Sequence, residues 1–239
     1  MDPFILEFVK NELNNLFKHA NVPESHGIEH ALNVLEHSIN AVEYLNCDND
    51  IKLRIKLASL LHDADDRKYF KGTCNASNIL TLVENKFNIS LDKQEILTMI
   101  DLVSFSKYGN IVPYNIQHEY MLYPIFSDRL EAIGNVGIYR CLLYSTESGL
   151  PLYLKSTPSL IDYNDIMNEA SNNRLEKYMK NGKSDSAVDH FYDKLLHIGK
   201  FKTTNPYFIR IKDIRVEPMI QFLSYYGKNL NIDHYLKML

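Results

Sequence analysis

Apolar residues recur every three or four positions through most of the chain, which is the spacing of one buried face of an α-helix. The first such run follows Asp2-Pro3, a pair that is typical of a helix start. Further helices are expected over residues 30–45, 50–62, 76–87, 90–103 and 119–144. Alternating strand patterns are scarce, so the pattern predicts an all-α fold with many helices around one core.

The pattern is less regular in two later segments. Residues 106–116 contain glycine and proline and are expected to form a loop, while Pro124 is expected to kink or restart the helix over 119–144. Residues 145–184 show little apolar periodicity and predict a long loop with a short helix around residues 165–179. Such a loop is a candidate lid over a nearby site.

The C-terminal part returns to helical spacing. Ser184 or Asp185 is expected to cap a helix that runs to Leu196, and Pro206 to open a final pair of helices that Pro218 interrupts. No linker-like or low-complexity stretch divides the chain. We therefore expect a single domain over residues 1–239, with a motif-bearing core at about 20–145 and with the lid-like loop and C-terminal helices of 146–239 packed on it.

Composition narrows the class of protein. The 239 residues carry a net charge of −4, which argues against broad electrostatic binding of nucleic acid or anionic membrane. The three cysteines are far apart and odd in number, so a disulfide framework or a thiolate zinc site is not expected and a reducing compartment fits. No apolar run approaches a membrane span, and nothing directs the chain out of the cytoplasm. The sequence leaves the oligomeric state open.

The strongest chemical signal is a His-Asp pair at the end of an apolar helix. Leu57, Leu60 and Leu61 would hold the pair rigidly. His62 offers an imidazole nitrogen and Asp63 a carboxylate oxygen, both of which are ordinary ligands of divalent cations. Burying an ionised carboxylate without a partner destabilises the folded state by roughly several kcal/mol, and a bound cation removes that cost.

Two ligands make a poor metal site, so the rest of the chain must supply more donors. His30, on the preceding helix, and Asp128, on a later one, are the candidates.

Five blocks, taken in order, extend this signal. They are His26-x-x-x-His30, Leu60-Leu61-His62-Asp63-x-Asp65-Asp66-x-Lys68, Val103-Ser104-Phe105-Ser106, Asp128-Arg129-Leu130-Glu131-Ala132-Ile133-Gly134 and His190-Phe191-Tyr192-Asp193-Lys194-Leu195-Leu196. In order and spacing the chain resembles the HD-domain superfamily of metal-dependent phosphohydrolases, and within it a subfamily of small stand-alone bacterial-type enzymes. The resemblance covers residues 20 to 225, roughly, and implies an all-α HD-domain fold.

The resemblance also implies a metal centre. Its ligands would be His30, His62, Asp63 and Asp128, holding one divalent ion. Mixed nitrogen and oxygen donors without thiolate suit manganese, iron, cobalt or nickel, with magnesium and zinc possible. Such an ion lowers the pKa of water and offsets charge on a phosphoryl group.

Other residues are candidates for catalysis and substrate binding. Asp66 lies one helical turn beyond His62 if that helix continues, which suits a general base, and Asp65 is its rival. The candidate substrate contacts are Lys68, Arg129, His26, Lys194 and Tyr192. The chain departs from the subfamily pattern at Gly27, where an Asp is common and would orient a ligand, and more mildly at Glu131.

The resemblance implies hydrolysis of a small nucleotide. We expect nucleoside or deoxynucleoside triphosphates to be cleaved to the monophosphate and diphosphate. Two alternatives stay open: a 5'-nucleotidase-type phosphomonoesterase, and a non-catalytic nucleotide-binding sensor or scaffold that keeps the metal site. Neither a nucleic acid nor a membrane is expected as a partner.

Overall fold

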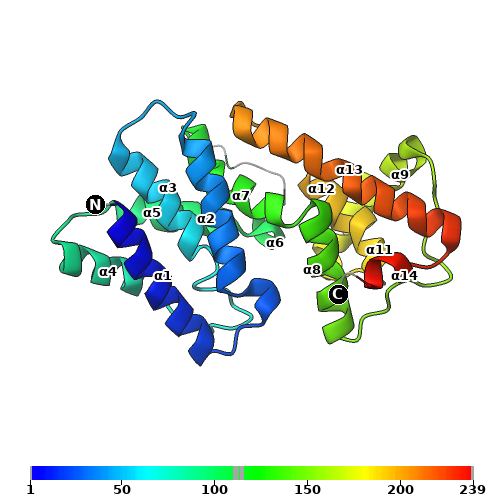
Figure 1. The fold of residues 1–239 in the computed structure, drawn as a ribbon, viewed down its shortest axis with the longest axis horizontal. Helices are drawn as coiled ribbons and strands as arrows, with labels where there is room; N and C mark the ends of the chain where they lie inside the picture. The colour runs from blue at the N-terminus through cyan, green and yellow to red at the C-terminus, as the bar shows by residue number, and fades with distance from the viewer. Residues whose placement is uncertain (1, 110–112, 114–115, 238–239) are drawn as a thin grey trace. The chain divides into compact units, whose positions relative to one another are not determined.

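The computed structural model describes residues 2–109, 113 and 116–237, and within them every regular element is a helix (Figure 1). The prediction of an all-α fold is confirmed. In the same described part of the chain, no helix is both long and apolar enough to cross a membrane.

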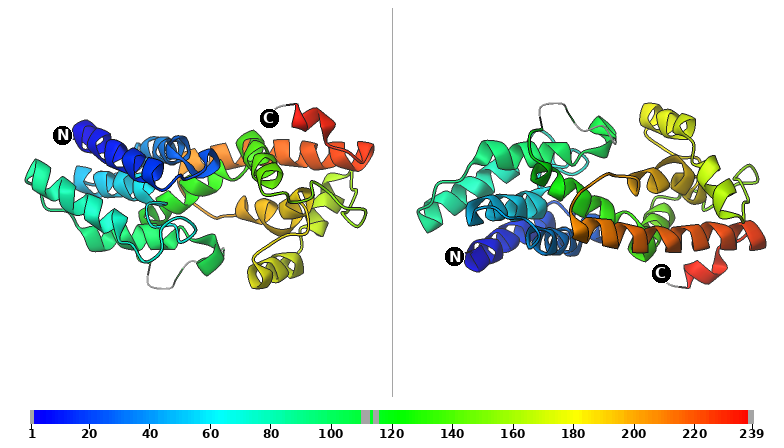
Figure 2. Two further views of the ribbon diagram at one scale, coloured as in Figure 1. Left: turned by 90° about the horizontal axis from the view of Figure 1, so that it is seen from below. Right: turned by 90° about the horizontal axis from the view of Figure 1, so that it is seen from above.

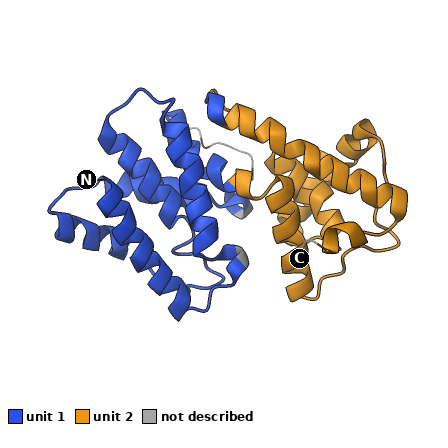
Figure 3. Ribbon diagram, in the orientation of Figure 1, with its two compact units in different colours: residues 1–108, 112–128, 205–207 blue, residues 109–111, 129–204, 208–239 orange. Residues whose placement is uncertain are grey.

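Two compact units make up the chain (Figure 3). Unit 1 comprises residues 1–108, 112–128 and 205–207, and unit 2 comprises residues 109–111, 129–204 and 208–239. The division falls between Asp128 and Arg129, inside a helix, and not near residue 145. A single domain over residues 1–239 stays a prediction.

Unit 1 is built around a helix whose C-terminal end is fully buried. Its elements are α1 (Asp2–His19), η1 (Glu24–His26), α2 (Ile28–Val42), α3 (Asn49–Leu61), α4 (Asn75–Phe87), α5 (Lys93–Leu102), α6 (Phe105–Tyr108), η2 (Glu119–Leu122) and the first part of α7 (Tyr123–Glu131). The C-terminal turns of α3, from Leu57 to Leu61, are buried on every side. Helices α1, α2 and α5 pack beside α3 (Figures 1 and 2), so α3 ends deep in this unit.

Unit 2 has an aromatic core. Its elements are the end of α7, α8 (Gly134–Glu147), α9 (Tyr163–Glu169), α10 (Asn172–Asn181), α11 (Ala187–His190), the π-helical turn η3 (Phe191–Leu195), α12 (Leu196–Ile198), α13 (Pro206–Asn229) after its first two residues, and α14 (Asp233–Leu236). Phe191 and Phe222 are fully buried, and their ring centroids lie 4.7 Å apart. Because aromatic rings bury a large apolar area, such pairs contribute strongly to the stability of a core.

Several predicted boundaries are correct. The first helix begins at Asp2, and Pro124 occupies the first turn of α7, where its missing N–H costs nothing. The expectation for Pro218 is wrong, because α13 runs unbroken from Pro206 to Asn229. The residue four positions before Pro218, Ile214, is 62% exposed. Water can therefore replace the backbone hydrogen bond that proline cannot make there, while the buried residues that follow hold the helix together.

Other boundaries also differ. The helix expected over 119–144 stops after Glu131, and α8 begins at Gly134, whose φ of +76° a residue with a side chain rarely adopts. The single helix expected around 165–179 is two helices, α9 and α10, with Ser171 between them.

The helix expected from Ser90 begins at Lys93, because the Asp92 side chain accepts the backbone N–H of Glu95 and caps it. Part of the loop expected over 106–116 belongs to α6, and residues 110–112, 114 and 115 of it lie outside the described residues.

Candidate metal centre

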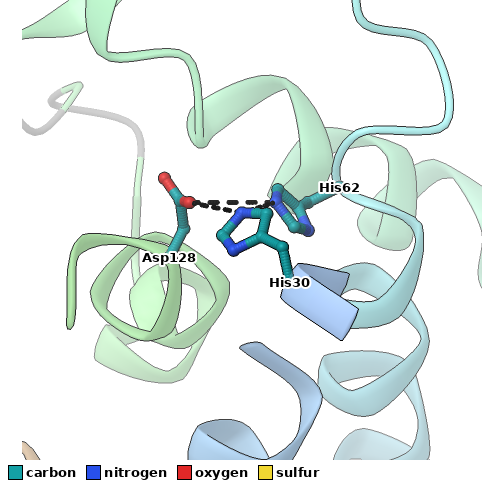
Figure 4. Close-up of side chains that lie close together, drawn as sticks. All are labelled: His30, His62 and Asp128. Atoms are coloured by element: carbon teal, nitrogen blue, oxygen red, sulfur yellow. Dashed lines mark hydrogen bonds and ion pairs between the residues drawn. The ribbon is translucent and has the colours of Figure 1, made fainter. Parts of the chain in front are cut away.

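Three helices of unit 1 bring donor atoms to one point (Figure 4). His30 lies in the first turn of α2, His62 follows the last residue of α3, and Asp128 lies on α7. The two imidazole Nε2 atoms are 3.2 Å apart. Asp128 Oδ1 lies 3.3 Å from His30 Nε2 and 3.8 Å from His62 Nε2. One donor atom of each residue thus lies within 4.8 Å of the other two.

Asp63 lies beside this cluster. Its Oδ2 is 3.2 Å from His62 Nε2 and 3.8 Å from His30 Nε2. Donors bound to one ion at about 2.1 Å lie roughly 3 to 3.5 Å from their neighbours. The contacts of 3.2 and 3.3 Å fall in this range, and the two of 3.8 Å are slightly longer. The two imidazoles are buried, whereas the side chains of Asp63 and Asp128 are 22% and 29% exposed. The carboxylates therefore form the open side of the site.

A backbone carbonyl orients one of the imidazoles. His62 Nδ1 lies 2.8 Å from the carbonyl oxygen of Ser59, and only a protonated nitrogen donates to a carbonyl. The neutral ring then carries its hydrogen on Nδ1, and Nε2 keeps the lone pair that a metal needs. The sequence did not indicate this acceptor, because every residue has a carbonyl and only the fold selects one.

The electrostatics of the cluster favour cations. Burial disfavours the charged imidazole, but the carboxylates of Asp63 and Asp128 outweigh that cost and raise the pKa of His62 to about 9. Burial likewise opposes ionisation of Asp63 and Asp128, yet the neighbouring histidines hold the pKa of both carboxyls below the usual value. Two imidazoles and two ionised carboxylates without a thiolate are the donor set of a divalent first-row metal, so the residues fit such an ion.

The two candidate general bases, Asp66 and Asp65, make different hydrogen bonds. Because α3 ends at Leu61, Asp66 is not one helical turn beyond His62, and that premise is wrong. Asp66 Oδ1 instead accepts the backbone N–H of Lys68 at 2.9 Å in the turn that follows. Asp65 Oδ1 accepts from the backbone N–H of Asn75 at 2.6 Å, and its Oδ2 from that of Ala76 at 3.2 Å. Asp65 therefore caps the start of α4. The catalytic role of either residue stays a prediction.

The predicted substrate contacts fall in both units. In unit 1, His26 is half-buried, with its ring centroid 6.5 Å from that of His30, and Lys68 is exposed. In unit 2, Arg129 is buried and its Nη2 donates to the Gly109 carbonyl at 2.6 Å. Their contacts with substrate stay predictions.

The C-terminal candidates also lie in unit 2. Tyr192 is fully buried, and its hydroxyl donates to the Pro158 carbonyl at 3.4 Å. Lys194 Nζ lies 5.6 Å from the centroid of the Tyr178 ring. Tyr192 serves the packing of unit 2, and a role for it or Lys194 in substrate binding stays a prediction.

The two departures from the subfamily pattern have different surroundings. Gly27 is the residue before α2, and a Cβ built there would meet Glu24 O at 3.4 Å, an ordinary contact. The neighbouring acid, Glu29, is exposed. Glu131 is buried and pairs with Arg215 Nη1 at 2.9 Å within unit 2. Glu131 thus contributes to the packing of unit 2.

Comparison with known proteins gives one relative of clear sequence similarity. The uncharacterized protein L803 of Acanthamoeba polyphaga mimivirus is 38% identical over 213 residues, which span 83% of this chain and 86% of that protein. No protein-family model matches the chain.

Solved structures resemble the chain over nearly its whole length. An HD-superfamily hydrolase from Bacillus thuringiensis has a TM-score of 0.66 at 18% identity and covers 97% of this chain and 99% of its own. Bacillus subtilis YpgQ in complex with ADP has a TM-score of 0.63 at 18% identity, covering 97% and 98%. At such identities the similarity establishes the fold. The chain therefore belongs to the family of mimivirus protein L803, and it has the fold of the HD-domain superfamily.

Proposed function

We propose that the protein is a metal-dependent phosphohydrolase that acts on nucleotides. The observation that carries the proposal is the convergence of the His30 and His62 Nε2 atoms with Asp128 within unit 1. Each of these two Nε2 atoms also lies 3.2 to 3.8 Å from a carboxylate oxygen of Asp63 and of Asp128. The fold supports it, since the similar Bacillus thuringiensis protein is an HD-superfamily hydrolase and YpgQ has been solved in complex with ADP.

The residues of the site have separate roles in this proposal. His30, His62, Asp63 and Asp128 would hold the ion, which when bound lowers the pKa of water and offsets charge on a phosphoryl group. The Ser59 carbonyl fixes the orientation of the His62 ring. The buried imidazoles form the base of the site, and the exposed edges of the carboxylates leave room for a substrate phosphate.

Asp66 is our candidate for the group that takes the proton from the attacking water. Its Oδ1 accepts one backbone N–H, and a carboxylate has about four lone-pair sites, so acceptor capacity remains for a proton. Asp65 is less suited, because both of its oxygens hold the start of α4. We propose that His26 and Lys68, which lie in unit 1 with the proposed metal ligands, contact the substrate.

The reaction that we favour is cleavage of nucleoside and deoxynucleoside triphosphates to the monophosphate and diphosphate. Lys68 is the cation of unit 1 that we assign to the distal phosphates, which would direct attack to the α-phosphorus. The competing orientation would place a terminal monophosphate at the ion and release inorganic phosphate. A third alternative is a nucleotide sensor that keeps the ion but has lost hydrolysis.

Product analysis tests the proposal. A panel of nucleoside mono-, di- and triphosphates is incubated with the protein and Mn²⁺, and products are separated by anion-exchange chromatography. We expect monophosphate and diphosphate from triphosphates, lost in Asp63→Ala. Asp50→Ala is the matched control, because Asp50 lies in the first turn of α3, the helix that precedes Asp63, and its side chain is 59% exposed.

Two results would contradict the favoured reaction. Nucleosides released from monophosphates, with triphosphates intact, would identify a nucleotidase. Bound Mn²⁺ with no turnover of any nucleotide would identify a sensor.

A further inference from the structure

Three buried serines, one from each helix of the metal centre, meet in unit 1. Ser38 lies on α2, Ser59 on α3 and Ser127 on α7, and each is 0% exposed. The Ser38 hydroxyl lies 2.5 Å from that of Ser59 and 2.8 Å from that of Ser127. We call these three residues the serine cluster, and Ser38 is its centre.

Each serine of the cluster is on a helix that also carries or precedes a proposed ligand. Ser127 directly precedes Asp128. The Ser59 carbonyl accepts from His62 Nδ1, so this one residue joins the cluster through its hydroxyl and the metal centre through its backbone. Ser38 follows His30 by eight residues of α2, about 12 Å along the helix axis.

Packing alone does not require hydroxyls at these positions. A buried hydroxyl costs roughly 1–3 kcal/mol unless it is hydrogen-bonded, and alanines would fill similar space without that cost. What hydroxyls add is directional geometry: two hydrogen bonds of 2.5 and 2.8 Å fix the separation of three backbones, which apolar contacts leave adjustable. A ligand site is sensitive to such separations, because donor distances to an ion are defined within a few tenths of an ångström.

We propose that the serine cluster positions the three ligand-bearing helices, so that Ser38, Ser59 and Ser127 set the affinity and coordination geometry of the metal centre without touching the ion. The inference rests on the proposed metal site. It assigns the serines as positioning residues. Replacing them should weaken metal binding by more than the accompanying loss of protein stability explains.

Metal titration of the whole 239-residue chain tests this inference. Wild-type protein, Ser38→Ala and Ser145→Ala are stripped of metal and titrated with Co²⁺ alone by calorimetry and by visible absorption, which reports coordination geometry. Ser145→Ala is the matched control: Ser145 is also buried, on α8 of unit 2, and its hydroxyl donates to the Cys141 carbonyl at 2.8 Å. We expect Ser38→Ala to weaken the Kd for Co²⁺ by about 10-fold or more and to shift the absorption bands, while the control changes neither.

A triple variant separates positioning from simple loss of stability. Ser38→Ala alone leaves two buried hydroxyls without their partner and destabilises the fold, whereas Ser38→Ala/Ser59→Ala/Ser127→Ala removes all three hydroxyls and recovers most of that stability. The Ser59 backbone carbonyl remains in both variants. Positioning predicts that the triple variant, although stable, still binds Co²⁺ about 10-fold or more weakly.

The outcomes are distinct. A triple variant that folds and binds Co²⁺ with the wild-type Kd and spectrum would overturn the inference and leave the metal site intact. Wild-type protein that binds no Co²⁺ would overturn the metal site, and the inference with it.

Discussion

Replacing Asp65 with alanine should destabilise the protein without slowing catalysis by the molecules that remain folded. Asp65 accepts three hydrogen bonds, from Asn75 N at 2.6 Å, Thr73 Oγ1 at 3.1 Å and Ala76 N at 3.2 Å. The two backbone donors belong to the first turn of α4, and the residue before α4, Cys74, makes no side-chain cap. The variant therefore removes the cap of a 13-residue helix together with a favourable charge at its N-terminus.

The size of the effect follows from these contacts. Loss of a helix cap costs about 0.5–2 kcal/mol, and the loss of charge from the helix N-terminus costs about 0.3–1 kcal/mol more. We expect a loss of about 1–3 kcal/mol in total. For a chain of this length, 1 kcal/mol shifts the midpoint of thermal unfolding by about 2–4 °C, which gives a shift of roughly 2–12 °C.

Asp66→Asn should have the opposite effect: turnover should fall while stability is kept. It keeps an acceptor for the Lys68 N–H, so stability should change by less than about 0.5 kcal/mol, whereas turnover should fall by about 10²-fold through loss of the general base. Thermal unfolding of both variants, with turnover and metal content measured below the transition, distinguishes the two carboxylates. An Asp65→Ala protein that unfolds at the wild-type temperature but has lost its turnover would refute the reasoning and make Asp65 the base.

Three further predictions use other parts of the structure. His62→Ala should purify without the roughly one divalent metal ion per chain expected of the wild type, as measured by elemental analysis, because it removes a convergent donor. Burial holds the pKa of His190 at about 3, so its unfolded form binds an extra proton below about pH 6.5, and stability should fall by up to about 1.4 kcal/mol per pH unit from pH 6 to pH 4. Denaturant titration should show a shallower loss in His190→Gln. Gly137→Ala should lower the unfolding midpoint strongly, because its Cβ would lie 2.3 Å from the Ala132 carbonyl oxygen, whereas Gly27→Ala, with 3.4 Å to Glu24 O, should lower it far less.

The proposed metal ligands show which features of the site can be predicted from the order of residues in the sequence. His30, His62 and Asp128 are identifiable from the sequence, because ligand chemistry belongs to the side chain and the order of blocks follows the order of helices. The structure brings these three within 4.8 Å of one another. It also gives Ser59, whose carbonyl orients His62, a role that no residue type could signal.

The sequence by itself determined the helical class, because the period of apolar residues is a local property that each segment satisfies independently of the others. It also determined which side chains are able to bind a cation. Only the tertiary structure decided how buried polar groups pair: Asp65 caps a helix that starts ten residues later, and Ser38 meets Ser127 from 89 residues away. Those pairings depend on how the helices pack against one another. Because that packing is set by the sum of many side-chain contacts across the core, no single stretch of sequence encodes it.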